Sequence, residues 1–362
     1  MKVLFDHLCF WQKFGGVPRY FVELMKHLPN DYYILTVKFS NNEYLKELPN
    51  IKYCSFLDNF YFKGKARLES EIGKLFTIPY LIRDNFDIYH QTHYDPYAFK
   101  YLSKTTRTIT TIHDMNFYVI PEYYPKRIYL KKQMETSIKK VDKIITISNN
   151  SKRDLCNYLD VPENKVSVIY HGVDLKKFQS EKSDKNYKEQ YILFVGARNK
   201  YKNFKNLLEA FTILRRQYSQ IKLYCAGPSP TKAENELIFS KKIIDSVRFI
   251  QATERELVSL YKNALFFVFP SLYEGFGLPI LEAMAANCPI VLSNTGSFPE
   301  IADNAGLYFN PYSIDDIYTQ MKCVIENSAL REKLKYNASI RVKDFTWERC
   351  VKQHLEVYNS LL

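Results

Sequence analysis

The chain has 362 residues, which is enough for two domains of ordinary size, each with its own hydrophobic core. Its composition, 46% hydrophobic and 25% charged, is typical of a globular protein and excludes a disordered or low-complexity chain. The formal net charge is +12, but no nucleic-acid-binding motif accompanies it, so we expect no nucleic acid as a partner.

The first half of the chain alternates short β-rich runs with segments long enough for crossover helices. Several of these runs are nearly continuously apolar, which is typical of buried parallel strands. We expect strands at Lys2–Asp6, Tyr32–Phe39, Ile51–Ser55, Asp87–Thr92, Thr106–His113, Lys143–Ser148 and Lys165–Tyr170. Residues 1–175 are therefore predicted to form a first, Rossmann-like domain.

The same pattern restarts after a polar stretch at 176–190, which we interpret as the interdomain linker. The second series of strands is expected at Tyr191–Val195, Ile221–Ala226, Val247–Ile250, Leu265–Phe269 and Pro289–Ser293. Residues 191–345 would form the second domain, and residues 346–362 an amphipathic helix that crosses back to the first. Two consecutive βαβ series predict an α/β protein with two doubly wound, Rossmann-like domains facing across a cleft.

The cysteines and the N-terminal segment bear on the compartment. The seven cysteines are scattered and include no C-x-x-C pair, which favours a reducing compartment over a disulfide framework or a zinc ribbon. The first residues reach a charge at Asp6, too early for the apolar region of a signal peptide, and no segment has the length of a membrane span. We expect a cytoplasmic protein.

Residues 266–285 carry the most informative pattern. An apolar run leads into a short loop with Glu274, Gly275 and Gly277, and a predicted helix follows that contains Glu282. A strand that delivers a glycine loop to a helix N-terminus presents free N–H groups to an anion. Two carboxylates beside those donors indicate an anion that also carries hydroxyls, as a nucleotide sugar does. The alternative is that both acids only stabilise the first turn of the helix.

Three other loops at predicted strand ends contain candidate binding residues. Gly15 and Gly16 precede a helix without the G-x-G-x-x-G fingerprint of dinucleotide sites, so they are either part of a phosphate site or a simple turn. His113 could contact a substrate hydroxyl or be a structural histidine. Arg198 and Lys202 could neutralise a departing diphosphate or be two solvated surface cations.

We expect no metal and no cofactor. His90 and His93 are three residues apart, but a strand would direct them to opposite faces, and no carboxylate or cysteine stands at ligand spacing. The chain also contains no Asp-x-Asp, the pair often used to hold a divalent ion against a diphosphate.

Basic residues are dense in two parts of the first domain. Between Lys126 and Arg153, nine basic residues face only two acidic ones, and Lys63, Lys65 and Arg67 follow a cluster of aromatic residues. These segments are either solvated helix faces or a surface for anionic lipid headgroups or a lipid-diphosphate acceptor.

Taken together, these motifs resemble retaining glycosyltransferases of family 4, which have the GT-B architecture. The specific match is E-x(7)-E from Glu274 to Glu282, and the resemblance runs the length of the chain. Supporting motifs are Gly-Gly-Val-Pro-Arg-Tyr at 15–20, Thr-Ile-His-Asp at 111–114, the Val-Asp-Lys-Ile-Ile-Thr-Ile-Ser run at 141–148, Tyr-His-Gly-Val-Asp at 170–174, Lys202-Asn203, Ser293-Asn294, Pro299-Glu300, residues 305–311 and Phe345-Thr-Trp-Glu.

The resemblance implies a role for each candidate residue. Glu282 would hold the ribose hydroxyls, Glu274 the hydroxyls of the donor sugar, and the amides of the glycine loop its phosphate side. Arg198 and Lys202 would bind the diphosphate, and His113 the far edge of the sugar. The implied catalytic residues are Glu274, His113, Arg198 and Lys202, and the implied donor-binding residues are Gly15, Gly16, Arg198, Lys202, Glu274, Gly275, Phe276, Gly277, Leu278 and Glu282.

The implied reaction transfers a hexosyl group, with retention, from a nucleoside-diphosphate sugar to a glycan or lipid-linked oligosaccharide acceptor. GDP-mannose is preferred, and UDP- or dTDP-sugars remain open because Gln251–Thr253 replaces a segment that often carries glycine near the base in the family. Such an enzyme of cell-surface polysaccharide or O-antigen synthesis would contact the inner face of the membrane peripherally. A non-catalytic nucleotide-sugar-binding protein and a nucleotide-dependent oxidoreductase are the competing interpretations. The acceptor, the linkage and the oligomeric state stay open.

Overall fold

The chain folds into two compact units, which we describe separately. The computed structural model describes residues 1–49, 51–58, 60, 62–83, 85–125, 127–180, 187, 189–198 and 200–362. One unit comprises Met1–Gly172 and Trp347–Leu362, and the other comprises Val173–Thr346. Of the linker expected at 176–190, residues 181–186 and 188 lie outside the described residues, and its first part belongs to helix α6 (Leu175–Ser180).

The first unit is built on a parallel sheet of six strands in the order β2-β1-β3-β4-β5-β6. The strands are β1 (Val3–Phe5), β2 (Tyr33–Leu35), β3 (Ile88–Gln91), β4 (Arg107–Ile112), β5 (Lys143–Thr146) and β6 (Val166–Val168). Apolar side chains on both faces of β1, β3 and β5 are fully buried, which explains the continuous apolar runs in the sequence.

Helices connect and cover these strands. They are α1 (Gly16–His27), α2 (Lys65–Arg83), α3 (Asn116–Val119), α4 (Ile128–Lys140), α5 (Asn149–Leu159) and α14 (Trp347–Asn359), with short 3-10 helices η1 (Leu8–Trp11), η2 (Glu43–Glu47), η3 (Pro96–Lys100), η4 (Pro121–Tyr123) and η5 (Glu163–Lys165).

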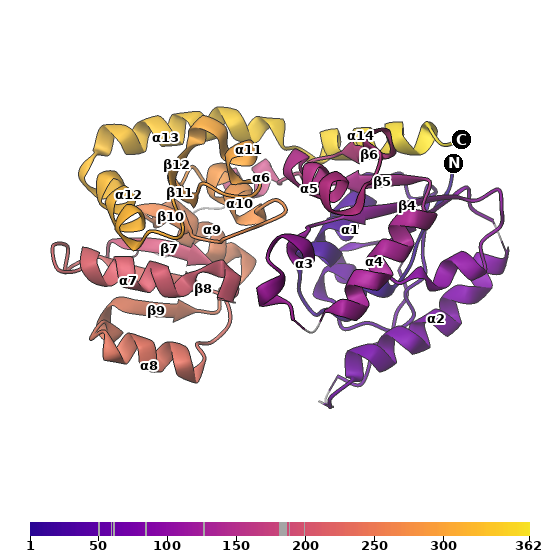
Figure 1. Ribbon diagram of the computed structural model, residues 1–362, viewed down its shortest axis with the longest axis horizontal. Helices are drawn as coiled ribbons and strands as arrows, with labels where there is room; N and C mark the ends of the chain where they lie inside the picture. Colours follow the sequence, from indigo (N-terminus) through magenta and orange to yellow (C-terminus); the bar gives the residue numbers. More distant parts are fainter. Residues whose placement is uncertain are drawn as a thin grey trace. The chain divides into compact units, whose positions relative to one another are not determined.

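Helix α14 is part of the first unit although it comes last in the sequence (yellow in Figure 1). Trp347 and Tyr358 join the same hydrophobic core as Phe5 and Tyr20. The hydroxyl of Tyr20 also lies 2.6 Å from Nε2 of His354. Apolar packing and a buried polar contact therefore both fasten this helix to the first sheet.

The second unit is built on another parallel sheet of six strands, in the order β12-β11-β10-β7-β8-β9. The strands are β7 (Tyr191–Val195), β8 (Lys222–Ala226), β9 (Val247–Ile250), β10 (Phe266–Phe269), β11 (Ile290–Ser293) and β12 (Gly306–Phe309). The helices are α6, α7 (Phe204–Leu214), α8 (Lys232–Ser240), α9 (Glu254–Asn263), α10 (Leu278–Ala285), α11 (Phe298–Ala302), α12 (Ile314–Glu326) and α13 (Ser328–Arg341), with η6 (Lys200–Lys202), η7 (Ile244–Ser246), η8 (Asp303–Ala305) and η9 (Val342–Asp344).

The predicted α/β class with two doubly wound parallel sheets is confirmed, with three corrections to the strands. The expected strand at Ile51–Ser55 is wrong: the segment makes one isolated bridge, between Phe39 and Cys54, and most of it is exposed. The expected strand at Tyr32–Phe39 ends at Leu35. Strand β12 was not predicted, because most of its residues are only partly buried and give a weak apolar signal.

Candidate active site

The second sheet reverses its strand order between β7 and β10. These two strands are neighbours, β8 and β9 lie on one side, and β11 and β12 lie on the other. In open α/β sheets, ligands bind outside the carboxyl ends of the strands at such a reversal. The loops that contain Arg198, Lys202, Glu274 and Gly277 follow these two strands.

The loop after β7 and the loop after β10 are joined by two contacts. The backbone N–H of Leu272 donates to the carbonyl of Tyr201 at 2.8 Å. The ammonium of Lys202 forms an ion pair with a carboxylate oxygen of Glu274, and both side chains are largely buried, with exposed fractions of 16% and 14%. The fold thus brings together two predicted site residues that are far apart in the sequence.

The conformation of the glycine loop depends on Gly277. This residue has a φ of +94° and lies directly before α10, whose N-terminus receives no side-chain cap hydrogen bond. A Cβ at Gly277 would lie 2.9 Å from Cε1 of Phe298, which is fully buried. Backbone conformation and packing both require glycine at this position. Leu278 is the first residue of the helix that follows. Pro279 has no N–H, and the N–H of Ile280 donates to the carbonyl of Gly277 at 2.8 Å, so the N–H of Leu278 and the helix dipole are what this N-terminus offers to an anion.

Ser297 donates hydrogen bonds to two carbonyl oxygens of the same loop. Its hydroxyl lies 3.1 Å from the carbonyl oxygen of Glu274 and 3.0 Å from that of Phe276, and the side chain is fully buried. We did not predict this residue from the sequence. Its position shortly after the Ser293-Asn294 motif that follows β11 is the signal that could have identified it.

Glu282 lies on α10 and is only 7% exposed. One of its carboxylate oxygens accepts a hydrogen bond from the hydroxyl of Tyr261 at 3.1 Å, and Tyr261 is itself fully buried on α9. A carboxylate in this environment is held in one orientation. Tyr261 is a second residue that the sequence did not single out.

Arg198 is bound within its own domain. Its Nε donates to a carboxylate oxygen of Glu234 at 2.8 Å, and Nη2 donates to the carbonyls of Pro228 and Ser229 at 2.7 and 3.0 Å. Burial opposes ionisation of Glu234, but hydrogen bonds from Thr231 and from Arg198 outweigh it and hold the pKa of Glu234 below its usual value. Of the guanidinium nitrogens, Nη1 is buried without a partner among the described residues. The diphosphate role of Arg198 stays a prediction.

The segment expected near the nucleotide base starts a helix. Thr253 caps α9 and Glu256 returns a hydrogen bond, which is a complete capping box. The amide of Gln251 donates to the hydroxyl of Ser229 at 2.7 Å.

His113 belongs to the first unit, where it follows β4. Its ring stacks on that of His171, with centroids 6.2 Å apart, and meets Tyr20 edge-on at 5.0 Å. Burial lowers the pKa of His113 to about 3, so the ring is neutral near pH 7. Nε2 is buried and has no hydrogen-bond partner among the described residues, and the contact of this ring with the donor sugar stays a prediction.

Gly15 and Gly16 also belong to the first unit. Gly16 begins α1, and Gly15 precedes it with an extended backbone. The two glycines and His113 are therefore carried by the first unit, and the other predicted site residues by the second.

The described residues contain no group of three or more His, Cys, Asp and Glu side chains arranged to hold a metal ion. Both ring nitrogens of His90 are engaged: Nδ1 lies 2.7 Å from the hydroxyl of Tyr358, and Nε2 lies 2.8 Å from that of Thr111. Among the helices that the structure describes, none is long and apolar enough to cross a membrane.

Comparison with known families decides the class of protein. The model described as "Glycosyltransferase Family 4" matches residues 14–177, and the model described as "Glycosyl transferases group 1" matches residues 176–341. The chain belongs to glycosyltransferase family 4. The predicted family is confirmed on both units, since the two matches together extend over most of each.

This family 4 glycosyltransferase has relatives in O-antigen synthesis. It is 27% identical to O-antigen chain mannosyltransferase B of Escherichia coli, with all of both chains covered. It is 30% identical to the O-antigen chain mannosyltransferase RfbU of Salmonella typhimurium, over 56% of each chain. Among solved structures, Anabaena HepE in complex with UDP and glucose superposes with a TM-score of 0.79 at 16% identity, covering 99% of this chain and 100% of that one. That likeness shows the fold, which is GT-B as predicted.

Proposed function

We propose that this protein is a retaining hexosyltransferase that transfers a sugar from a nucleoside diphosphate to a hydroxyl of a glycan or lipid-linked acceptor. The observation that carries the proposal is the union of the loops after β7 and β10 at the strand-order reversal of the second sheet. Lys202, Glu274 and the N-terminus of α10 meet there, with Glu282 on the same helix.

The donor has three kinds of group, and the loops offer a matching partner for each. Glu282 is oriented by Tyr261 and would accept hydrogen bonds from the ribose hydroxyls. The N-terminus of α10, through the N–H of Leu278 and the helix dipole, would bind phosphate oxygens. Lys202 would neutralise the diphosphate, which requires that it exchange Glu274 for phosphate oxygens. Glu274 is then free to accept hydrogen bonds from hydroxyls of the transferred sugar.

In the proposed reaction, the acceptor oxygen forms a bond to the anomeric carbon while the bond from that carbon to the leaving phosphate oxygen breaks. The acceptor proton passes to that phosphate oxygen on the same face of the sugar, so configuration is retained. The protein lowers the barrier chiefly by stabilising negative charge on the departing diphosphate, through Lys202, the α10 N-terminus and Arg198. Glu274 acts as a positioning group. The proposal includes no metal and no cofactor, because these cationic groups supply the charge.

For the sugar and the acceptor we propose mannose and a cell-surface glycan. The support is the function of two relatives, which are O-antigen chain mannosyltransferases. We propose GDP-mannose as the donor, with UDP- and dTDP-sugars as the alternatives. Of these two alternatives, the UDP and glucose bound by HepE favour the UDP-sugar. The protein would work at the inner face of the membrane, in peripheral contact with anionic lipid.

A thermal-shift panel of GDP-, UDP-, dTDP- and ADP-sugars tests the proposal. A ligand at 100 times its dissociation constant stabilises the folded state by about 2.7 kcal/mol, which is easily detected. One nucleotide sugar should raise the melting temperature, and a panel without any shift would contradict the assignment. Transfer of labelled sugar to an acceptor then separates an enzyme from a non-catalytic binding protein, and an oxidoreductase would instead oxidise or reduce its substrate.

A further inference from the structure

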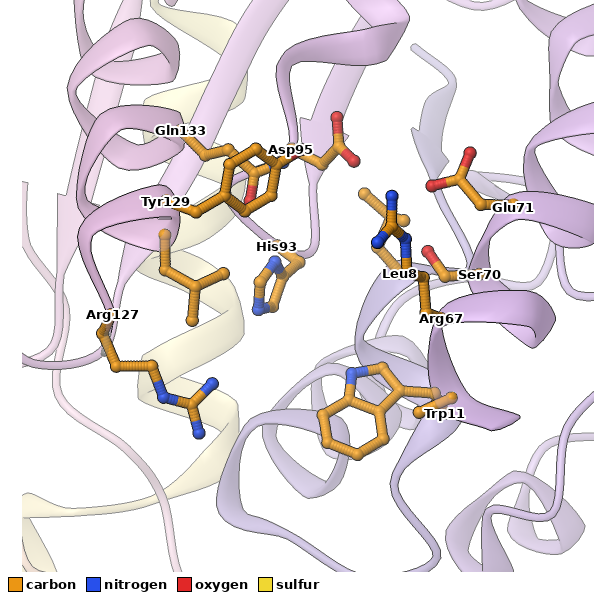
Figure 2. Close-up of a pocket in the computed structure, with 12 residues that line it drawn as sticks. Leu8, Trp11, Arg67, Ser70, Glu71, His93, Asp95, Arg127, Tyr129 and Gln133 are labelled. Carbon is orange, nitrogen blue, oxygen red and sulfur yellow. The ribbon is translucent and has the colours of Figure 1, made fainter. Parts of the chain in front are cut away.

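The first sheet also reverses its strand order, between β1 and β3. A pocket of about 480 Å³ lies at the carboxyl ends of these two strands, between α2 and α4 (Figure 2). Leu8 and Trp11 follow β1, and His93 and Asp95 follow β3. The rule that places ligands at strand-order reversals therefore points to this pocket, and the donor role proposed above does not use it.

Helix α2 is fastened to the end of β1 and forms one wall of this pocket. Nδ1 of His7 lies 2.9 Å from the hydroxyl of Thr77, and Nε2 lies 3.0 Å from the carbonyl oxygen of Ser70. Gly73 allows this approach, since a Cβ there would lie 2.2 Å from the His7 ring. The wall that presents Arg67 is thus fixed by packing and hydrogen bonds.

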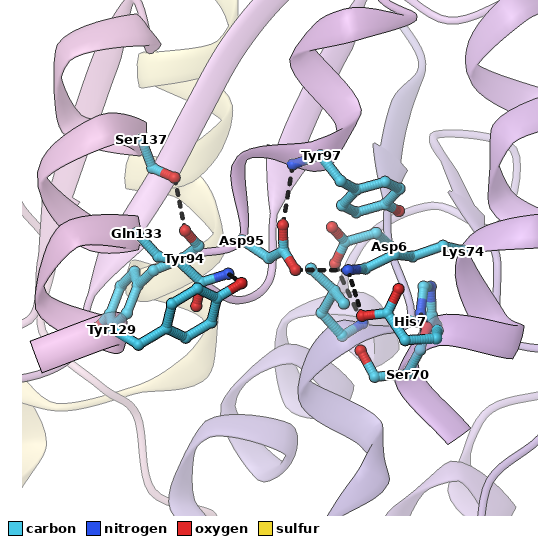
Figure 3. A network of polar contacts seen from close by, with 12 residues as sticks. Asp6, His7, Ser70, Lys74, Tyr94, Asp95, Tyr97, Tyr129, Gln133 and Ser137 are labelled. Atoms are coloured by element: carbon cyan, nitrogen blue, oxygen red, sulfur yellow. Dashed lines mark hydrogen bonds and ion pairs between the residues drawn. The ribbon is translucent and has the colours of Figure 1, made fainter. Parts of the chain in front are cut away.

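The carboxylates around the pocket are already paired. The ammonium of Lys74 lies 2.7 Å from Asp95 and 2.8 Å from Glu71 (Figure 3). Asp95 also accepts a hydrogen bond of 3.0 Å from the backbone N–H of Tyr97. These contacts orient both acids toward Lys74 and reduce the negative charge that they present to the pocket.

The guanidinium groups in the pocket are not paired. Among the residues that the structure describes, no ion pair or side-chain hydrogen bond engages Arg67 or Arg127. Figure 2 shows them on opposite sides of the pocket, with His93 between them in this view. Burial lowers the pKa of His93, so this ring is neutral near pH 7 and the arginines carry the positive charge. The charged side chains that line the pocket are therefore Arg67 and Arg127 together with Glu71 and Asp95, and both of these acids bond Lys74. The buried carboxylate of Asp6 also lies close enough to His93 to act on its pKa.

We propose that this pocket binds a phosphate group of the acceptor between Arg67 and Arg127, with the indole of Trp11 against the adjoining sugar or lipid. The inference rests on the proposed transferase function and names the chemistry of its acceptor. Two planar guanidinium forks can each grip two oxygens of a phosphate, whereas a carboxylate has only two oxygens in all. Trp11 is 41% exposed and offers an apolar face in the same pocket.

Calorimetric titration compares mannose 1-phosphate with methyl α-mannoside, which lacks the phosphate. The protein is first saturated with the nucleotide that binds it, so that phosphate cannot enter the donor site. Wild type should bind the phosphorylated probe about ten-fold more tightly or better, as charge-assisted hydrogen bonds predict. The double variant Arg67→Gln/Arg127→Gln should lose this preference.

The matched control is Lys132→Gln/Lys139→Gln, which removes two exposed positive charges from α4 outside the pocket. It should keep the preference. The proposal is overturned if wild type shows no preference for the phosphorylated probe, if the arginine variant keeps it, or if the lysine control loses it equally. Binding of the nucleotide sugar, measured on the same variants, reports separately on the proposed function and should not change.

A competition arm distinguishes the sources of the phosphate. Displacement of mannose 1-phosphate by decyl phosphate would identify the headgroup of a lipid-linked acceptor, as the basic clusters of the first domain suggest. Displacement only by other sugar phosphates would identify a phosphorylated glycan. Either result supports the arginine pair as a phosphate site, and binding unaffected by both kinds of competitor contradicts it.

Discussion

At the strand-order reversal of the second sheet, the cations are paired within the protein: Lys202 with Glu274, and Arg198 with Glu234. At the reversal of the first sheet, Arg67 and Arg127 have no partner among the described residues. A ligand that binds at the second sheet must displace a carboxylate from Lys202 or Arg198, and this lowers the affinity of the ligand. The same ion pairs keep the two cations ordered before the ligand binds. A ligand of the first sheet meets unpaired charge. If both proposals hold, similar strand topology serves two kinds of anion site, one with paired and one with unpartnered cations.

Removal of Lys202 should have the largest effect. Lys202→Ala is expected to lower turnover by about 10²–10³-fold, as typical for loss of one donor to developing charge, with a smaller change in donor affinity. Single-turnover transfer kinetics measure it. Lys205→Ala on α7, an exposed lysine nearby, is the control and should behave as wild type. A Lys202→Ala enzyme with the wild-type rate would show that the paired lysine plays no part with the leaving group.

Glu282→Gln should weaken nucleotide-sugar binding by about 10- to 100-fold, since the amide keeps only one acceptor oxygen and one hydrogen bond to an ionised acceptor, worth about 1.5–3 kcal/mol, is lost. The amide keeps the shape of the side chain and can still bond Tyr261, so the fold should persist. Calorimetry gives the dissociation constant, and the exposed Glu348→Gln on α14 is the control. An unchanged dissociation constant would contradict the assignment of the donor to the site that contains Lys202, Glu274 and Glu282.

Acid should act on the first unit, which contains all seven histidines. Burial lowers the pKa of His354 to about 4, against about 6.5 in the unfolded chain. As the pH falls from about 6.5 toward 4, His354 binds a proton in the unfolded state but stays neutral in the folded state. Stability should fall by about 1.4 kcal/mol per pH unit for this group.

Urea unfolding at pH 7 and pH 5, followed by the fluorescence of Trp347 in α14, checks this effect. His354→Gln should reduce the loss at pH 5 by about 2 kcal/mol relative to wild type. Lys132→Gln, an exposed change in the same unit, should not. Equal pH dependence in all three proteins would contradict the role of the buried ring.

Gly277→Ala measures how much the packing of Gly277 against Phe298 contributes to stability. Gly196→Ala is the matched control in the same unit: both positions have positive φ, +94° and +119°, but a Cβ at Gly196 meets nothing within 4 Å. Both variants carry backbone strain, and Gly277→Ala should be less stable than the control by about 1 kcal/mol because of the contact with Phe298. Equal free energies of unfolding for the two variants, measured in denaturant, would show that the loop relaxes and avoids the contact with Phe298.

The sequence identified strands well where the apolar run was long. β7 has its predicted bounds because all of its residues are apolar and polar segments flank it. β9 also has its predicted bounds, although it includes the exposed Arg248. The segment at 51–55 has the right residue types, but strand formation also needs a partner strand, which local sequence does not reveal. Partly buried β12 gave too little contrast to be recognised.

The candidate site was predictable only as separate loops. Strand ends placed Lys202 and Glu274 at the same edge, but their ion pair depends on β7 and β10 being neighbours. Ser297 and Tyr261 act from other elements and carry no motif of their own. Arg67 and Arg127 fell within predicted basic clusters, but only the fold shows that they line one pocket.

Hydrogen exchange measured by mass spectrometry, with and without the nucleotide sugar that binds most tightly, tests the central claim most directly. Amide protection should increase in residues 271–282 and 200–203, which belong to the loops and helix that carry Lys202, Glu274 and Glu282. No added protection in those segments, despite saturation with the ligand, would contradict the assignment of the donor to this edge.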